Sequence, residues 1–129
     1  MNKSRELSSI DDDIVMYILV NMDLGMYKGK IASQVAHSAC EVERYLVNHS
    51  TQLYREWSRT GYTKIVLKSN LKEMEPMTYM FNNRSQELWC AFTRDFGRTQ
   101  VEADSLTTLA FNPIRRKDAP DCIKKLKLL

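Results

Sequence analysis

The amino-acid sequence predicts an α/β fold: a single compact domain in which helices flank a four-stranded, mixed but mostly parallel sheet. The chain has 129 residues, which is near the common size of one domain. Short apolar runs alternate with longer helical stretches, and a strand that follows a crossover helix usually runs parallel to the strand before it. Neither an internal repeat nor a low-complexity linker divides the chain.

Four apolar runs are the predicted strands. The first, over residues 14–20, is continuous and rich in β-branched residues, as is typical of a strand covered on both faces. The other three are the runs over residues 64–68, 88–92 and 106–111. The last strand follows the third too closely for a crossover helix, so we expect it to run antiparallel to a neighbour.

Four helices separate or follow these strands and give the order β-α-α-β-α-β-β-α. They are predicted over residues 30–48, 51–59, 71–81 and 118–126. Gly61 closes the second helix, and Ser69 or Asn70 caps the third. Pro76 lies inside the third helix and should end, kink or shift it. Pro120 is tolerable because it falls in the first turn of the last helix.

Composition and charge exclude several classes of protein. The net charge of +3 is a mild surplus that favours an anionic partner without identifying one. Cys40, Cys90 and Cys122 are odd in number and form no CxxC pair, which argues against a disulfide framework or a closed zinc site and favours a reducing compartment. No apolar run approaches the roughly 18 residues of a membrane span. We therefore expect a cytoplasmic protein.

The polar residues 1–13 resemble neither a signal peptide nor a transit peptide. Their three consecutive aspartates, Asp11 to Asp13, are more typical of a solvated, frayed end than of a cation site. We therefore predict a flexible N-terminal segment over residues 1–13 and a domain over residues 14–129.

The first predicted helix has two contrasting faces. At 100° per residue, one stripe is apolar and should pack on the sheet; it consists of Ile31, Val35, Ala39, Val42 and Leu46. The opposite face is polar and consists of Lys30, Gln34, His37 and Glu41. By periodicity alone, ordinary solvation explains this polar face.

The position of the helix favours a functional role instead. In open α/β sheets ligands bind beyond the carboxyl ends of the strands, where helix N-termini also attract anions. Lys28 and Lys30 follow the first predicted strand, and Asp95 follows the third. We expect these groups to meet at one edge of the sheet, where an ammonium, an imidazole and a carboxylate can carry out acid–base chemistry.

Shorter patterns in the same regions fail as signatures. Residues 25–31 are one residue short of the phosphate loop GxxxxGK and place Ile31 where a hydroxyl must reach magnesium. Asp95-Phe96-Gly97 matches the kinase magnesium motif, but the other kinase motifs are missing. Cys40 lies three residues after His37 and could be an activated thiol, although a small buried helix residue fits the pattern better.

Two longer motifs together resemble the type 2 peptidyl-tRNA hydrolases of archaea and eukaryotes. They are KGKIASQVAH over residues 28–37 and DFGRTQV over residues 95–101. Further matching residues, in unchanged order, are residues 23–26, Trp57, Gly61, Lys64 and the closing residues 126–129. The resemblance runs from about residue 14 to the C-terminus, and the predicted order of elements agrees with that family's compact α/β fold.

This resemblance implies hydrolysis of the ester that joins a peptide to the terminal ribose of tRNA. Peptidyl-tRNA is then the partner, and no cofactor or metal is implied. The positions that correspond to the family's catalytic site are Lys30, Gln34, His37, Asp95 and Thr99. The candidate contacts to the substrate are Lys28, Arg98 and Gln100. Arg115 and Arg116 form either a further contact to the tRNA backbone or a solvated basic turn.

Ester hydrolysis needs an activated water, a site for the oxyanion and a proton for the leaving oxygen. We assign base character to Asp95, with Thr99 ordering the water. Lys30 and the N-terminus of its helix would stabilise the oxyanion, while His37 would position or shuttle protons. No particular serine is spaced to complete a triad with His37.

The sequence departs from the family pattern in three places. Phe96 stands where the family commonly has alanine, and it could narrow the site. Glycines that are common near Asp104 and in the segment over residues 110–113 are missing, which could reshape the turn before the last strand.

Two other functions remain open on the same fold, because a fold alone does not determine function. One is a tRNA-binding module without catalysis, and the other is a protein-interaction adaptor. Binding measured at increasing salt concentration distinguishes these two functions, since the affinity of binding through phosphate contacts falls steeply as the salt concentration rises. A homodimer is also open, although no residue argues for it.

Overall fold

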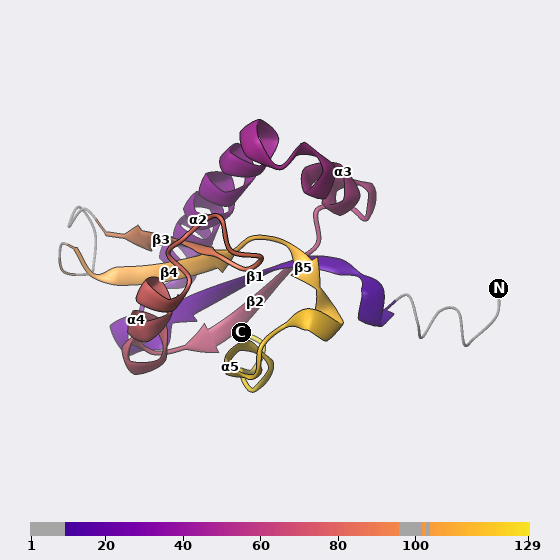
Figure 1. Cartoon of the computed structure of the whole chain (residues 1–129). Coiled ribbons are helices and arrows are strands. Elements are labelled where there is room, and N and C mark those ends of the chain that lie inside the picture. Colours follow the sequence, from indigo (N-terminus) through magenta and orange to yellow (C-terminus); the bar gives the residue numbers. More distant parts are fainter. Residues whose placement is uncertain (1–9, 96–101, 103) are drawn as a thin grey trace.

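The computed structural model describes residues 10–95, 102 and 104–129, which form a sheet between two layers of helices (Figure 1). The strands are β1 (Ile14–Asn21), β2 (Lys64–Ser69), β3 (Cys90–Arg94), β4 (Leu106–Phe111) and β5 (Ile114–Arg115). The helices are α2 (Lys28–His49), α3 (Thr51–Arg59), α4 (Leu71–Met80) and α5 (Asp121–Lys124). Two 3₁₀ turns are η1 (Met22–Leu24) and η2 (Arg116–Asp118).

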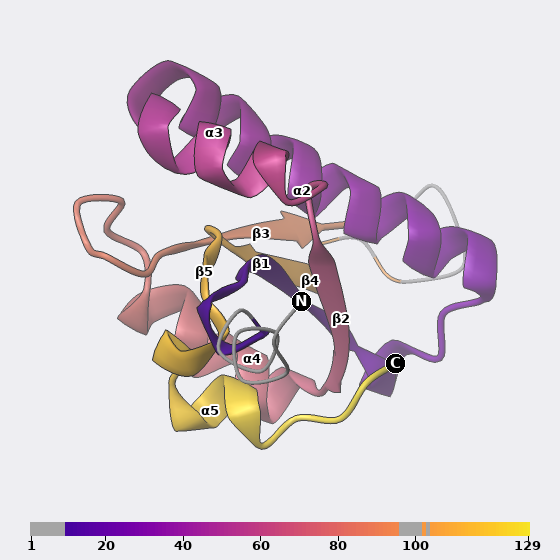
Figure 2. The same cartoon turned by 90° about the vertical axis from the view of Figure 1, so that its right-hand side faces the viewer.

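The central strand β1 is buried on both faces. Its even-numbered residues Ile14, Met16 and Ile18 join the apolar cluster under α2 and α3. Its odd-numbered residues Val15, Tyr17 and Leu19 join the cluster under α4 and α5. Figure 2 shows these two helix pairs on opposite sides of the sheet. Because successive side chains of a strand point to opposite faces, this burial explains the continuous apolar run.

The strand order is β2-β1-β4-β3, with β5 pairing to β1. β1 and β2 are parallel, whereas β4 lies between β1 and β3 and runs antiparallel to both. The predicted α/β class and the antiparallel last strand are therefore confirmed. Two details differ from the predicted four-stranded, mostly parallel sheet. The short β5 is an additional strand. Because β4 lies between β1 and β3, the pair β1–β2 is the one parallel pair among the described strands.

Most predicted helices match the structure closely, and the exceptions are local. The Asn70 side chain caps α4 by accepting a hydrogen bond from the Glu73 amide at 2.9 Å. Pro76 does not end α4, which continues to Met80. The predicted helix over residues 118–126 is shorter than expected, because η2 precedes it and only Asp121–Lys124 is α-helical.

The described cysteines are free thiols. Cys90 is buried, and burial raises the pKa of its thiol to about 12. Cys40 is exposed on α2, so the interpretation of it as a buried helix residue was wrong. None of the described helices is both long and apolar enough to cross a membrane. Most of the predicted N-terminal segment, residues 1–9, lies outside the described residues.

Candidate active site

The chain turns sharply between the end of β1 and the start of α2. The Asn21 side chain accepts a hydrogen bond from the Asp23 amide at 3.0 Å and donates one to the Leu106 carbonyl at 2.9 Å. Gly25 then adopts a left-handed conformation with φ of 59°, which glycine reaches without a steric penalty. This turn ties the exit of β1 to the start of β4 and directs the first turn of α2 over the same edge of the sheet.

Asp95 is fixed at the end of β3 by its own backbone. Its amide donates to the Ser105 carbonyl at 3.0 Å, and its carbonyl accepts from the Asp104 amide at 2.7 Å. Asp104 has a left-handed φ of 64°. The family that the sequence resembles commonly has glycine near this position, and aspartate is one of the few other residues that tolerates the conformation. The missing glycine therefore does not prevent the turn from forming.

Lys30 and Asp95 form an ion pair across 65 residues of sequence. The Lys30 Nζ donates a hydrogen bond to the Asp95 Oδ1. The Asp95 side chain is 3% exposed and the Lys30 side chain 14% exposed, so water screens this pair only weakly. The structure thus brings together the ammonium of the first helix turn and the carboxylate that leaves the third strand, as expected from the strand order.

Three hydroxyls, of the buried Ser38 and Thr108 and the partly buried Thr93, hold α2 against the sheet. Ser38 Oγ lies 2.7 Å from Thr93 Oγ1 and 2.6 Å from Thr108 Oγ1. Thr108 donates to the Gln34 carbonyl at 3.0 Å, and a carbonyl can only accept. Each hydroxyl has one proton, so the direction is fixed: Thr93 donates to Ser38, Ser38 to Thr108, and Thr108 to Gln34.

Sequence reasoning missed this hydroxyl chain. Ser38 lies on the border between the apolar stripe and the polar face, and a single serine there carries no distinct signal. Thr93 and Thr108 have side chains that are typical of any strand. Only the packing of α2 on β3 and β4 shows that the three hydroxyls meet.

We expect Ser38→Ala to lower the free energy of unfolding by about 1–3 kcal/mol, because it removes the acceptor for Thr93 and the donor to Thr108 in a buried site. Urea unfolding followed by circular dichroism measures this change. Ser58→Ala is a matched control, since the Ser58 hydroxyl bonds only to Arg55 of its own helix and its loss should cost less than about 0.5 kcal/mol. Equal midpoints for the two variants would contradict this role.

The residues of the polar face predicted for the first helix differ in burial in the structure. Gln34 is buried, with 4% of its surface exposed, and Lys30 turns toward Asp95. The ordinary solvation that periodicity alone suggests does not hold for these two residues, because the sheet beneath them presents hydroxyls and a carboxylate. His37 is exposed and Glu41 is partly exposed.

His37 does not join the ion pair. Within the described residues it makes no hydrogen bond or ion pair, and it follows Lys30 by two helical turns, which is about 10 Å along the axis. It nevertheless lies on the same side of α2 as Lys30, since seven residues return to within roughly 20° of the starting direction. The imidazole is therefore on the same side of α2 as Lys30, two helical turns away from it.

The predicted substrate contacts divide into three groups. Lys28 is exposed in the first turn of α2, next to the site. Arg98, Thr99 and Gln100, together with Phe96, lie outside the described residues. Arg115 and Arg116 are at the other end of β1, because β5 pairs with Ile14 and Val15 and α2 begins beyond Asn21. The structure therefore does not bring these two arginines to the Lys30–Asp95 pair.

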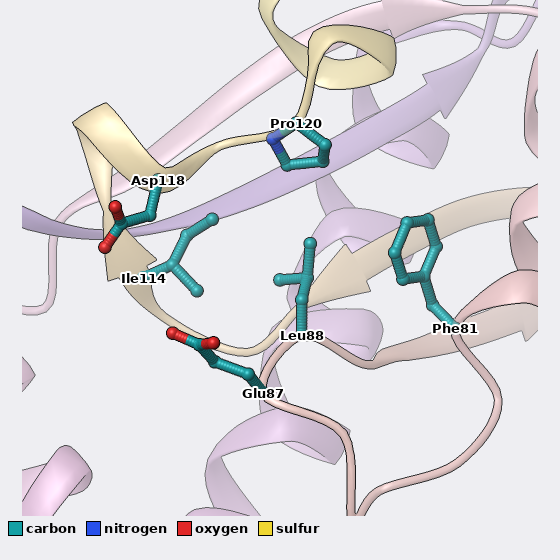
Figure 3. A pocket seen from close by; sticks show the side chains of 6 residues that line it. All are labelled: Phe81, Glu87, Leu88, Ile114, Asp118 and Pro120. Atoms are coloured by element: carbon teal, nitrogen blue, oxygen red, sulfur yellow. The ribbon is translucent and has the colours of Figure 1, made fainter.

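A pocket of about 400 Å³ lies at the opposite end of β3 from Asp95. Figure 3 shows the side chains that line it, which are Phe81, Glu87, Leu88, Ile114, Asp118 and Pro120. Two of them are carboxylates and none is a cation, a lining that repels phosphate groups. This pocket is therefore a poor site for a polyanionic substrate, whereas the edge that carries Lys28 and Lys30 suits one.

Comparison with known proteins identifies relatives over nearly the whole chain. The family model described as "Peptidyl-tRNA hydrolase PTH2" matches residues 14–129. The "Probable peptidyl-tRNA hydrolase 2" of Drosophila melanogaster is 37% identical over 120 residues, which are 93% of this chain and 64% of that protein. This chain therefore spans slightly less than two thirds of the fly relative.

Archaeal relatives are matched over almost their full length. The "Peptidyl-tRNA hydrolase" of Methanococcus maripaludis is 36% identical over 112 residues, which are 87% of this chain and 96% of that protein. The protein of the same name from Methanocaldococcus jannaschii is 34% identical over 114 residues, covering 88% of this chain and 98% of the relative. In both comparisons the match covers most of the domain that contains Lys30 and Asp95.

Proposed function

Because the chain belongs to the peptidyl-tRNA hydrolase PTH2 family, we propose that it hydrolyses the ester between a peptide and the terminal ribose of tRNA, releasing free tRNA. The observation that carries this proposal is the contact between Lys30 Nζ and Asp95 Oδ1 at the N-terminus of α2. It joins the two motifs of the family, which lie far apart in the sequence, in one weakly solvated site.

Asp95 is the proposed base. Its carboxylate accepts a hydrogen bond from Lys30, and its backbone makes two hydrogen bonds to the turn that follows β3. These contacts give the carboxylate a fixed position for accepting a proton from the attacking water. Thr99 would order this water. When water attacks the ester carbonyl, negative charge develops on the carbonyl oxygen, and the tetrahedral intermediate then expels the ribose oxygen, which takes up a proton.

Lys30 and the N-terminus of α2 are the proposed oxyanion site. The Lys30 ammonium lies next to the proposed base. Tyr27, the N-cap residue, provides no side-chain hydrogen bond to the first turn, so the leading N–H groups of α2 can donate to an anion. Gln34, which is buried one turn further along α2, is the remaining residue of the proposed catalytic set.

Lys28, Arg98 and Gln100 are the proposed contacts to the tRNA. Lys28 is exposed beside the site, where its ammonium can reach a phosphate without displacing the Lys30–Asp95 pair. Arg115 and Arg116 would reach only a part of the tRNA about 25 Å away, since β1 has eight residues. Because the proposed substrate arises in translation, we place the protein in the cytoplasm.

We expect His37→Ala to lower kcat/KM for N-acetylaminoacyl-tRNA by about tenfold, less than the loss expected for a group in contact with the ion pair. The imidazole is exposed and would guide the proton toward the leaving ribose oxygen. Steady-state hydrolysis over a range of pH measures the effect. A wild-type rate at all pH values would remove His37 from the mechanism while leaving Lys30 and Asp95 in place.

The decisive test uses two substrates side by side. We expect the protein to release tRNA from peptidyl-tRNA and to leave free aminoacyl-tRNA intact, as acid gel electrophoresis of the tRNA would show. If the protein binds peptidyl-tRNA stoichiometrically but leaves both esters intact, it is a tRNA-binding module and this proposal is wrong.

A further inference from the structure

β3 is an edge strand with an open outer side. It stands last in the strand order, so β4 pairs with one of its sides and no described strand pairs with the other. Phe92 is 44% exposed and Arg94 is also exposed, so one face of the sheet is accessible to solvent at this end of β3. Proteins usually protect such an edge because its unpaired amides and carbonyls attract other strands.

The hydrogen bonds of β3 reveal which backbone groups point outward. Asn112 donates to the Trp89 carbonyl at 3.1 Å, and Asp95 donates to the Ser105 carbonyl at 3.0 Å. In an antiparallel pair the bonded residues alternate, so the residues between these two that bond to β4 are Ala91 and Thr93. The register shifts between Thr93 and Arg94, but Asp95 bonds to the β4 side again, so we infer that the N–H and C=O groups of Phe92 and Arg94 point away from the sheet.

Most of the backbone groups that point outward from β3 have no hydrogen-bond partner within the described residues. The Cys90 amide is satisfied, since it donates to the Phe81 carbonyl at 2.9 Å. For the backbone of Phe92 and Arg94, no bond to a described residue outside the strand ladder is found. The Arg94 guanidinium instead bends back over the Phe92 ring and bonds to the Asp104 carbonyl at 3.0 Å. Directly before Asp95, two donors and two acceptors therefore have no partner among the residues that the structure describes.

We propose that the outer edge of β3 binds the peptide part of the substrate as an additional, parallel strand, through the backbone of Phe92 and Arg94. This inference rests on the proposed function, because it takes the ester to be cleaved at Lys30 and Asp95. An extended peptide that adds to a sheet edge gains affinity from main-chain hydrogen bonds.

The direction of the peptide follows from the chemistry. The C-terminal residue of the peptide carries the ester, so this residue must lie at the Asp95 end of β3. β3 itself runs toward Asp95, and the added strand must therefore be parallel to it. Phe92 is three residues from Asp95, which corresponds to about 10 Å of extended chain and to about three peptide residues.

Main-chain pairing also suits the task. A hydrolase for peptidyl-tRNA has to accept peptides of different sequence, and main-chain bonds do not depend on side chains. The neighbouring surface is compatible with an added strand, because α2 passes over β3 and β4 (Figure 2). The exposed His37 lies on the same side of α2 as Lys30, which contacts Asp95. The peptide would then lie between this side of α2 and the open edge.

A length series on the wild-type protein tests the inference directly. The substrates are N-acetyl-(Ala)n-tRNA with n from 1 to 5, which share one ester and one side chain. We expect kcat/KM to rise by roughly tenfold between n of 1 and n of 4 and then to level off, as successive amides reach Phe92 and Arg94. N-methylation of single amides should lower kcat/KM about tenfold at alternate positions and less than about twofold between them.

Two variants of Phe92 separate the backbone from the side chain. In Phe92→Pro the outward N–H is lost while the bonds to β4 are kept, since proline is tolerated at an edge when its missing donor faces solvent. We expect kcat/KM for the substrate with four alanines, divided by kcat/KM for the substrate with one alanine, to fall close to one. In Phe92→Ala the N–H remains, and the ratio should stay near the wild-type value. If Phe92→Pro does not fold, the N-methylated series decides.

Each outcome has a distinct meaning. A flat length series together with position-independent N-methylation overturns the inference, while cleavage of the n of 1 substrate still supports the proposed function. If wild-type protein cleaves none of the substrates, the proposed function itself is wrong. If sedimentation shows a dimer that Phe92→Pro dissociates, a second copy of the chain occupies the edge and the inference is again overturned.

Discussion

Replacing Asp95 by asparagine is expected to lower kcat/KM for N-acetylaminoacyl-tRNA by about 100-fold or more. Asparagine has almost the same shape, and its amide oxygen can still accept the hydrogen bond from Lys30 Nζ. It cannot take a proton from the attacking water at neutral pH. The loss should therefore appear mainly in kcat, because the substitution removes a group that acts in the transition state.

Asp104→Asn is the matched control for Asp95→Asn. Asp104 belongs to the same turn and is exposed, and asparagine tolerates its left-handed φ of 64° as well as aspartate does. We expect less than about a twofold change in kcat/KM. Asp95→Asn protein that folds normally and turns over at a rate similar to that of the control would refute the assignment of the base.

Replacing Lys30 by methionine is expected to have the second largest effect, again about 100-fold in kcat/KM. Methionine keeps the length of the side chain and removes the charge that would stabilise the oxyanion. It also leaves the Asp95 carboxylate, which is 3% exposed, without the ammonium that neutralises it. We therefore expect the free energy of unfolding to fall by about 2–3 kcal/mol, measured by urea titration.

Lys28→Met is the matched control for this change, because Lys28 is a lysine in the same helix turn but is exposed. It should leave stability within about 0.5 kcal/mol of the wild type. Its kcat/KM should fall only modestly and lose part of its salt dependence, as expected for one phosphate contact. If Lys28→Met lowers kcat more than Lys30→Met does, the two lysines have been assigned the wrong way round.

The double variant Lys30→Met/Asp95→Asn tests whether the pair acts as one unit. Its stability should exceed that of Lys30→Met, because the neutral amide no longer requires a counter-charge. Its kcat/KM should be no lower than that of the poorer single variant, since groups that act together are not additive. Fully additive losses would show that Lys30 and Asp95 act in separate steps.

The sequence predicted the overall fold well because its signals are local. The run over residues 14–20 is apolar at every position, and in the structure β1 is buried on both faces. The Asn70 cap and the end of the second helix near Gly61 are likewise set by neighbouring residues. The position of β4 between β1 and β3 was not predictable, because strand pairing joins segments that are distant in the sequence.

The sequence by itself determined the family, the class of fold and the expectation that Lys30 and Asp95 meet, since these depend on motifs and on the order of elements. The predicted apolar stripe of α2 is confirmed at Ala39, Val42 and Leu46, and only the tertiary structure showed that burial extends to Gln34 and Ser38. There Gln34 and Ser38 are covered by the hydroxyls of β3 and β4, and His37 remains exposed. Periodicity reports how side chains are arranged around a helix, but burial depends on the groups that the facing strands present.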